Sequence, residues 1–147
     1  MAKNKNIWIQ RKVLNSKAFC SLSSGAMLVY LHFLMKRQMG KTSNKKDSWI
    51  IKNNGELVFT YVMAKKELGM YPSRFMRSID KLIENGLLDI PHTGSGSRKG
   101  DYNLYAISDR WELFGKDNFV KKTRPKDTRK IGFRHNKQHI KTRVSKQ

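Results

Sequence analysis

The stretch from Thr60 to Gly86, TYVMAKKELGMYPSRFMRSIDKLIENG, constrains the fold more than any other, because it predicts two helices joined by a tight turn. Thr60 suits the N-cap of the first helix, and Gly69 allows the turn. Pro72 suits the first position of the second helix, where its missing N–H would have been unpaired anyway. Gly86 suits the end of that helix.

The second of these helices has two distinct faces. The apolar residues recur at helical spacing and form one face: Phe75, Ile79, Leu82 and Ile83. The polar residues recur at i, i+3, i+4 and i+7 and form the opposite face: Arg74, Arg77, Ser78 and Lys81. Basic residues on an exposed helix are usually just solvated. A cationic helix at the end of a helix-turn-helix, however, also fits a duplex major groove, whose walls are phosphates.

The charge of the chain favours the second interpretation. Its 147 residues suit one domain plus a tail, and they include 31 lysines and arginines against 11 acids, a net charge of +20. Such a charge indicates polyanionic partners rather than a fold. Nucleic acid is the first candidate, followed by an anionic membrane surface or an acidic protein.

Cysteine content and hydropathy exclude several classes. The single cysteine, Cys20, excludes an intrachain disulfide framework and a multi-cysteine zinc module, and its setting suggests a small buried side chain. The longest apolar run, 26–35, is too short to span a bilayer, and the N-terminus lacks a signal peptide. We therefore expect a cytoplasmic, nucleoid-associated protein.

Upstream of Thr60, the pattern predicts three features. Residues 6–14 suggest a short strand or extended arm. A helix is expected from a cap at Ser23 or Ser24 to about Met39, with an apolar face of Met27, Tyr30, Leu31, Leu34 and Met35. After a polar loop at 40–48, the apolar runs 49–51 and 57–59 flank Asn-Asn-Gly, a turn signal that predicts a short strand or hairpin arm.

Downstream of Gly86, the pattern predicts a β-hairpin. Two short apolar segments, 87–90 and 102–107, bracket GSGSRKGD, a tip that carries Arg98 and Lys99. Ser108 then opens a short helix with Trp111 and Phe114. The order helix, strand, helix, turn, helix, hairpin is that of a winged helix.

From residue 116 to 147 the composition changes. This segment holds 12 lysines and arginines and two acids, with few apolar residues, so it cannot bury enough surface to fold alone. We interpret residues 1–115 as a winged helix-turn-helix domain with an N-terminal arm. Residues 116–147 are interpreted as a basic, flexible tail that tracks phosphates rather than a merely solubilising end.

The linked segments 13–34, 53–90 and 101–115 resemble winged helix-turn-helix proteins of bacterial plasmids, phages and integrative elements, including winged domains of replication initiators. The resemblance covers about two thirds of the chain. It implies that Arg74, Arg77, Ser78 and Lys81 face DNA and that Arg98 and Lys99 lie on the wing tip. The chain departs from the family at Tyr71-Pro72, where a small capping residue is more usual.

Catalytic and metal motifs are missing from the sequence. Gly40-Lys41-Thr42 lacks the first glycine of a phosphate loop, and His135 and His139 lack the glutamate of a metalloprotease helix. Asp80 and Glu84 lie four residues apart on the basic helix, where we expect salt bridges with Lys81 or its neighbours rather than catalysis. No enzyme activity, cofactor, metal or small-molecule substrate is expected.

The sequence thus predicts a non-catalytic α+β protein that binds double-stranded DNA, as a transcriptional regulator or a replication-associated factor of a mobile element. Phosphate contacts are expected from the wing (Arg98, Lys99), the loop (Lys45, Lys46) and the tail (Lys121, Lys122, Arg124). Two alternatives stay open: docking of a protein through Tyr71, Met70 and Met76, and RNA binding through the tail alone. Homodimerisation also stays open.

Overall fold

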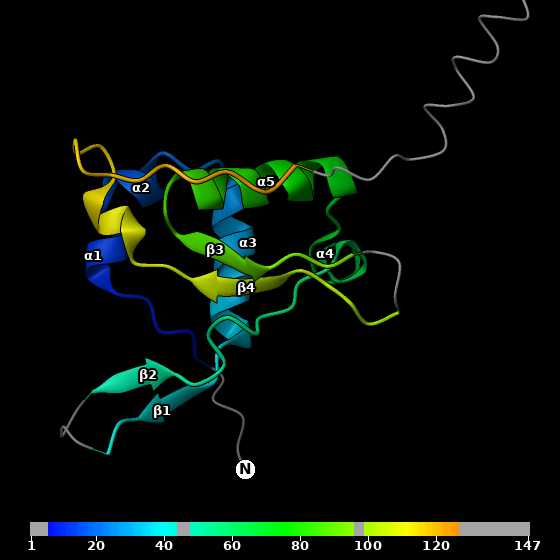
Figure 1. Cartoon of the computed structure of the whole chain (residues 1–147), viewed down its shortest axis with the longest axis horizontal. Helices are drawn as coiled ribbons and strands as arrows, with labels where there is room; N and C mark the ends of the chain where they lie inside the picture. Colours follow the sequence, from blue (N-terminus) through cyan, green and yellow to red (C-terminus); the bar gives the residue numbers. More distant parts are fainter. Residues whose placement is uncertain (1–5, 44–47, 96–98, 127–147) are drawn as a thin grey trace, which may run out of the picture.

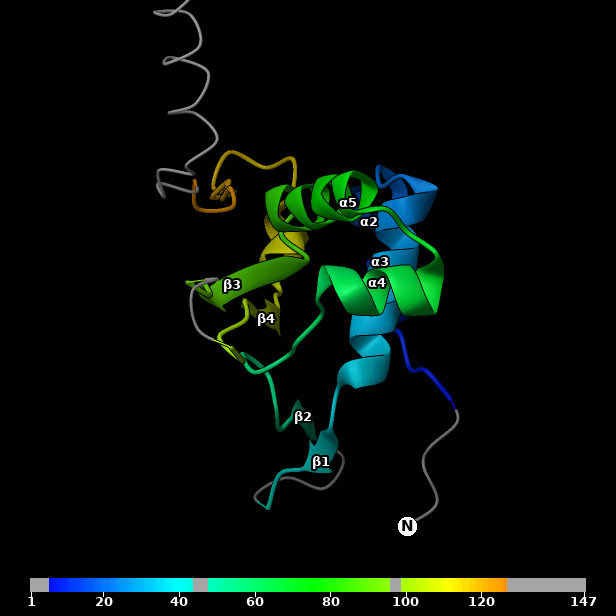
Figure 2. The same cartoon turned by 90° about the vertical axis from the view of Figure 1, so that its right-hand side faces the viewer.

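The computed structural model describes residues 6–43, 48–95 and 99–126, which form a small mixed α+β domain. Lys45, Lys46 and Arg98, together with the tail beyond residue 126, lie outside the described residues. Helix α3 runs through the centre, α5 lies across one end of it, and the β1–β2 hairpin lies at the other end (Figures 1 and 2). In chain order the elements are α1 (Arg11–Leu14), α2 (Lys17–Cys20), α3 (Ser24–Lys36), β1 (Met39–Lys41), β2 (Trp49–Ile51), α4 (Tyr61–Leu68), α5 (Pro72–Glu84), β3 (Leu88–His92), β4 (Leu104–Ile107) and the 3₁₀-helix η1 (Arg110–Leu113).

Helix α3 is the core helix that the sequence predicts. The Ser23 side chain accepts a hydrogen bond from the backbone N–H of Ala26, which confirms the N-cap. Tyr30 and Leu34 of the predicted apolar face are buried. Met35 is 59% exposed, so its assignment to that face is wrong.

The predicted end of this helix, at about Met39, is also wrong, because Asn53 stops it at Lys36. The Asn53 Nδ2 donates to the Lys36 carbonyl oxygen at 2.9 Å, and its Oδ1 accepts from the Gln38 backbone N–H at 2.7 Å. These bonds satisfy the groups that a further helical turn would have paired. The chain then leaves α3 in extended conformation and enters β1.

The β1–β2 hairpin differs from the predicted pairing. Strand β2 pairs with β1, with Gly40 opposite Ile50, so part of the predicted 40–48 loop is a strand. Asn53 to Gly55 do form a turn, and Gly55 has φ 89°. The segment after that turn does not pair with β2, because Leu57 forms an antiparallel bridge with Tyr105 instead. The predicted short strand is thus present as β2, but its partner is β1 rather than the segment after the Asn-Asn-Gly turn.

Helices α4 and α5 and the turn between them match the prediction closely. The Thr60 side chain accepts from the backbone N–H of Met63, and Gly69 adopts φ 61° after the last residue of α4. Pro72 is the first residue of α5. Gly86 follows α5 with φ 81°, and a Cβ there would lie 2.7 Å from the backbone nitrogen of Trp111. Only glycine fits this junction.

The predicted second hairpin is present as β3 and β4. The two strands are antiparallel, with Leu88 opposite Ile107, and the register shifts between Asp89 and His92. The hairpin lies on the side of α3 to which α5 also packs (Figure 2). The short helix after β4 is η1, which buries Trp111 against the end of α5.

Aromatic rings join these elements into one core. The Phe33 ring packs edge-on against Phe59 at 5.2 Å and against Tyr105 at 5.0 Å. Phe59 in turn contacts Phe75 of α5 at 5.1 Å. The core thereby connects α3, the segment before α4, α5 and β4, and it fixes the position of α5.

The N-terminal segment contains two corrections. Residues 11–14, predicted as part of a strand or an extended arm, form the short helix α1, and residues 17–20 form the short helix α2. Cys20 is exposed rather than buried. Helix α2 has one turn, and it directs Ala18 and Phe19 into the core, so the next residue faces solvent.

Candidate nucleic-acid interface

Three cations form a stripe along the exposed side of α5, which we call the basic stripe: Arg74, Arg77 and Lys81. All three are exposed, and within the described part of the chain none of them forms an ion pair. On the opposite side of α5, Phe75, Ile79, Leu82 and Ile83 are buried as predicted. The free charges of the stripe are thus held on a helix that cannot rotate without exposing its core residues.

Ser78 does not belong to this stripe. It is only 3% exposed, and its hydroxyl donates to the Arg74 carbonyl oxygen at 2.9 Å. A Cβ on Gly25 would lie 3.4 Å from the Ser78 Oγ and 3.0 Å from the Arg74 Nε. Ser78 therefore packs where α5 approaches α3, and its prediction as a residue of the exposed face is wrong. Arg77 and Lys81 keep the predicted orientation.

The first part of the predicted tail packs against α5, and we call residues 119–126 the strap (orange in Figure 1). The Arg124 guanidinium bonds both carboxylate oxygens of Asp80, at 2.8 and 3.3 Å, and also contacts the Met76 sulfur. Lys121 lies 4.0 Å from Glu84. The two acids of α5 therefore pair with the strap rather than with Lys81. Residues 119–126 are not a free tail.

Arg110 connects the strap to the rest of the domain. Its guanidinium bonds Asp89 at 2.7 Å, the carbonyl oxygens of Ile83 and Leu88, and the carbonyl oxygen of Val120 in the strap. Lys122 lies 3.5 Å from the same Asp89 carboxylate. One arginine thus joins the end of α5, the start of β3 and the strap, an arrangement that the sequence alone did not reveal.

Asp89 makes this junction sensitive to acid. Burial raises the pKa of its carboxyl, but hydrogen bonds from Arg110 and Ser108 and the charges of Arg110 and Lys122 outweigh burial, so the pKa lies below 3.8. A carboxyl whose pKa is lower in the folded state stabilises the fold above the unfolded pKa. This contribution is lost as the pH falls from about 4 through the lowered pKa.

We expect the Asp89→Asn variant to be less stable at neutral pH by about 1 to 2 kcal/mol, because Arg110 loses its half-buried counter-charge. Its free energy of unfolding should also fall less than that of the unmodified chain between about pH 4 and pH 2. Urea titrations at several pH values measure both effects. Asp117→Asn, at an exposed carboxylate, is the control. Parallel acid profiles for the unmodified chain and the Asp89→Asn variant would contradict the assignment.

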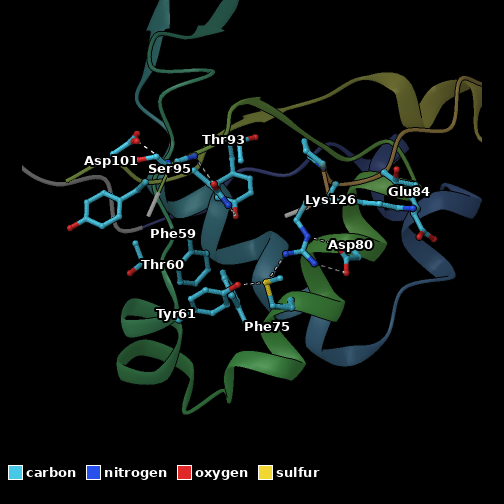
Figure 3. A pocket seen from close by; sticks show the side chains of 18 residues that line it. Phe59, Thr60, Tyr61, Phe75, Asp80, Glu84, Thr93, Ser95, Asp101 and Lys126 are labelled. Atoms are coloured by element: carbon cyan, nitrogen blue, oxygen red, sulfur yellow. Dashed lines mark hydrogen bonds and ion pairs between the residues drawn. The ribbon is translucent and has the colours of Figure 1, made fainter. Parts of the chain in front are cut away.

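A cavity of about 890 Å³ lies between α5, the start of α4, the β3–β4 hairpin and the strap (Figure 3). Its wall carries the acids Asp80, Glu84 and Asp101. Its floor includes aromatic residues of the core, among them Phe59 and Phe75. Arg124 also lines this space, and its guanidinium bonds Asp80. The strap thus supplies the positive charge on a wall that would otherwise be acidic.

The β3–β4 hairpin carries its own polar cluster near the tip. Asp101 accepts hydrogen bonds from the backbone N–H of Ser95, at 2.8 Å, and faces the His92 Nε2, also at 2.8 Å. The hydrogen bonds from His92 and Ser95 hold the pKa of Asp101 well below its ordinary value. Lys99, two residues before Asp101 in the chain, is exposed. The other predicted wing residue, Arg98, and the loop residues Lys45 and Lys46 lie outside the described residues.

The structure therefore brings together only part of the predicted set. Arg74, Arg77 and Lys81 share one stripe, whereas Lys121, Lys122 and Arg124 are paired with acids. None of the described helices is long and apolar enough to cross a membrane. A scan of protein-family models finds no match for the chain, and searches of curated proteins and of solved structures find none either. We therefore infer the function from the residues of the chain.

Proposed function

We propose that the chain binds double-stranded DNA without catalysis, as a winged helix-turn-helix protein in which α5 is the recognition helix and the β3–β4 hairpin is the wing. The observation that carries the proposal is the basic stripe of α5: three exposed cations, unpaired within the described residues, on a helix whose opposite side is anchored in the core. An exposed helix of this kind fits the width of the major groove.

The charge around the stripe supports the same function. Asp80 and Glu84 on the flank of α5 would repel phosphates, but the strap pairs them with Arg124 and Lys121. With those acids paired, the exposed side of α5 presents mainly positive charge. The net charge of +20 would accelerate encounter with DNA and supply binding to any sequence.

The biological role we propose is transcriptional regulation or replication of a mobile element, supported by the resemblance of the sequence to such winged domains. The alternative of protein docking through Tyr71, Met70 and Met76 has less support from the structure than from the sequence alone. Met70 is 2% exposed, and Met76 contacts Arg124 and the Tyr61 hydroxyl, which leaves Tyr71 as the accessible member.

Replacing Arg77 by alanine is expected to relax sequence preference. An arginine that bonds a guanine edge contributes about 1 to 3 kcal/mol of discrimination, so affinity for a preferred site should fall about tenfold or more. Affinity for random duplex should change by less than about threefold, because only one charge is lost. The preferred site comes first from selection out of a random duplex pool, and fluorescence anisotropy then gives both affinities.

The matched control is Arg11→Ala, which removes one exposed arginine from α1 instead of α5. It should weaken binding to both duplexes slightly and equally. An equal loss of affinity for both duplexes in the Arg77→Ala variant would contradict the proposal that Arg77 reads the base sequence. Failure of the selection to enrich any sequence, with intact folding, would favour protein docking or binding by the tail alone.

A further inference from the structure

The β1–β2 hairpin lies at the end of α3 opposite α5 (Figures 1 and 2), and it carries an exposed tryptophan. Trp49 is 58% exposed, and Met39 beside it is 39% exposed. The two strands form a sheet of their own, which pairs with none of the other described strands. A two-stranded sheet gains little stability from an exposed tryptophan, so the side chain is better explained by a ligand.

The strand register assigns this surface to one face of the hairpin. Lys41 is directly opposite Trp49, and Met39 is opposite Ile51, so all four side chains share that face. The Lys41 Nζ lies 5.4 Å from the centre of the Trp49 ring. Ile50 belongs to the other face, where the stem of Lys52 covers Gly40. The face thus combines a flat indole with a fixed positive charge.

We propose that this face binds single-stranded nucleic acid, with an unpaired base stacked on Trp49 and Lys41 close to the adjoining phosphate. A nucleotide is a ligand that supplies both a flat π-face and a negative charge, which is the complement of this pair. Duplex DNA keeps its bases stacked on one another, so it cannot offer the same contact without being opened.

Two other occupants fit the surface less well. A second copy of the chain would bring Lys41 against its counterpart, in a protein of net charge +20. A peptide strand added to the edge would find only three residues in each strand, too few for an extended hydrogen-bonded ladder. The charge and the short edges therefore favour a nucleotide.

Single-strand binding at this hairpin is separate from duplex binding at α5, since the two elements lie at opposite ends of α3 (Figures 1 and 2). One molecule could hold a duplex at one end and an unpaired strand at the other, as happens where a duplex is opened. The stacking site does not depend on α5 being a recognition helix. The two proposals can therefore fail separately.

The test uses the full chain and an oligothymidylate of about 15 nucleotides, a length within the usual range of single-strand sites. A Trp8→Phe background leaves Trp49 and Trp111, of which Trp111 is buried and reports little on ligands. We expect the oligonucleotide to quench Trp49 fluorescence. Carrying out the titration at about 0.3 M salt suppresses the electrostatic contribution of free lysines and arginines to binding.

Substitutions at position 49 separate stacking from mere apolarity. In a Trp8-containing chain, Trp49→Leu should weaken binding of the labelled oligonucleotide about tenfold, as expected for the loss of one stacked base. Trp49→Phe retains a ring and should stay within about threefold. Ile50→Ala is the matched control, because it removes an exposed apolar side chain from the other face of the same strand.

Five outcomes would overturn the proposal. Absence of quenching, or equal affinities for the Leu and Phe variants, would exclude stacking. An equal loss for Ile50→Ala would attribute the effect to hairpin folding. Equal quenching by a duplex of the same length would exclude selectivity for single strands. Self-association of the free chain that Trp49→Leu abolishes would assign the face to a second copy.

Discussion

Replacing Phe33 by alanine should destabilise the domain by about 3 to 5 kcal/mol, the range for emptying a phenylalanine site in a packed core. Phe33 is fully buried in the C-terminal part of α3, and its ring contacts Phe59 and Tyr105 edge-on. Those two residues lie on the segment before α4 and on β4. Removing the ring leaves a cavity and also loses two aromatic contacts.

Chemical denaturation followed by circular dichroism measures this loss. A domain of this size has about 5 to 15 kcal/mol of total stability, so the Phe33→Ala variant should unfold at much lower denaturant concentration or not fold at all. Leu28→Ala is the control on the same helix, since Leu28 is 44% exposed and its loss should cost less than about 1 kcal/mol. Similar losses for the two variants would show that Phe33 is not at the centre of the core.

The segment from Thr60 to Gly86 could be predicted from sequence because its signals are local. The Thr60 cap, the Gly69 turn, Pro72 at the first helical position and Gly86 at the end each act within a few residues of the chain. The apolar period of α5 is similarly local. The burial predicted for Phe75 and for the other apolar positions of the same face is therefore confirmed.

The features that could not be predicted depend on residues far apart in the chain. Leu57 pairs with Tyr105, and Asn53 ends α3, although each pair of partners is separated by many residues. Ser78 fits the polar face by period, but Gly25 lets α3 approach so closely that the serine is buried. Helical period alone does not say which neighbour a face will meet.

The strap is the clearest case in which composition alone led to a wrong prediction. Lys121 and Arg124 belong to a segment whose charge and low apolar content indicate a free tail. They nevertheless form ion pairs with Glu84 and Asp80 of α5, and Phe119 packs edge-on against Phe114 at 5.4 Å. The acidic pair on an otherwise basic helix was the available hint that a cationic segment covers it.

Stepwise shortening of the C-terminus should therefore have two distinct effects on duplex binding. A chain ending at Lys126 loses seven lysines and arginines and one aspartate, and it keeps the strap. The slope of log affinity against log salt should become shallower by up to about 6, at about 0.9 for each lost phosphate contact. Binding to every duplex at low salt should weaken by about 10² to 10³, with sequence preference retained, because α5 is unchanged. Anisotropy titrations over a salt series measure both quantities.

A chain ending at Gly115 also loses the strap, which leaves the carboxylates of Asp80 and Glu84 without Arg124 and Lys121. Those carboxylates then repel phosphates beside the basic stripe, so this chain should bind more weakly than the loss of cations alone explains. Adding Asp80→Asn and Glu84→Gln to the shorter chain should restore part of the affinity, whereas the same pair in the chain ending at Lys126 should have little effect. Equal effects in both chains would show that the strap acts only as added positive charge. If the chain ending at Lys126 binds no duplex at all, the tail is the binder and α5 is left free to dock a protein.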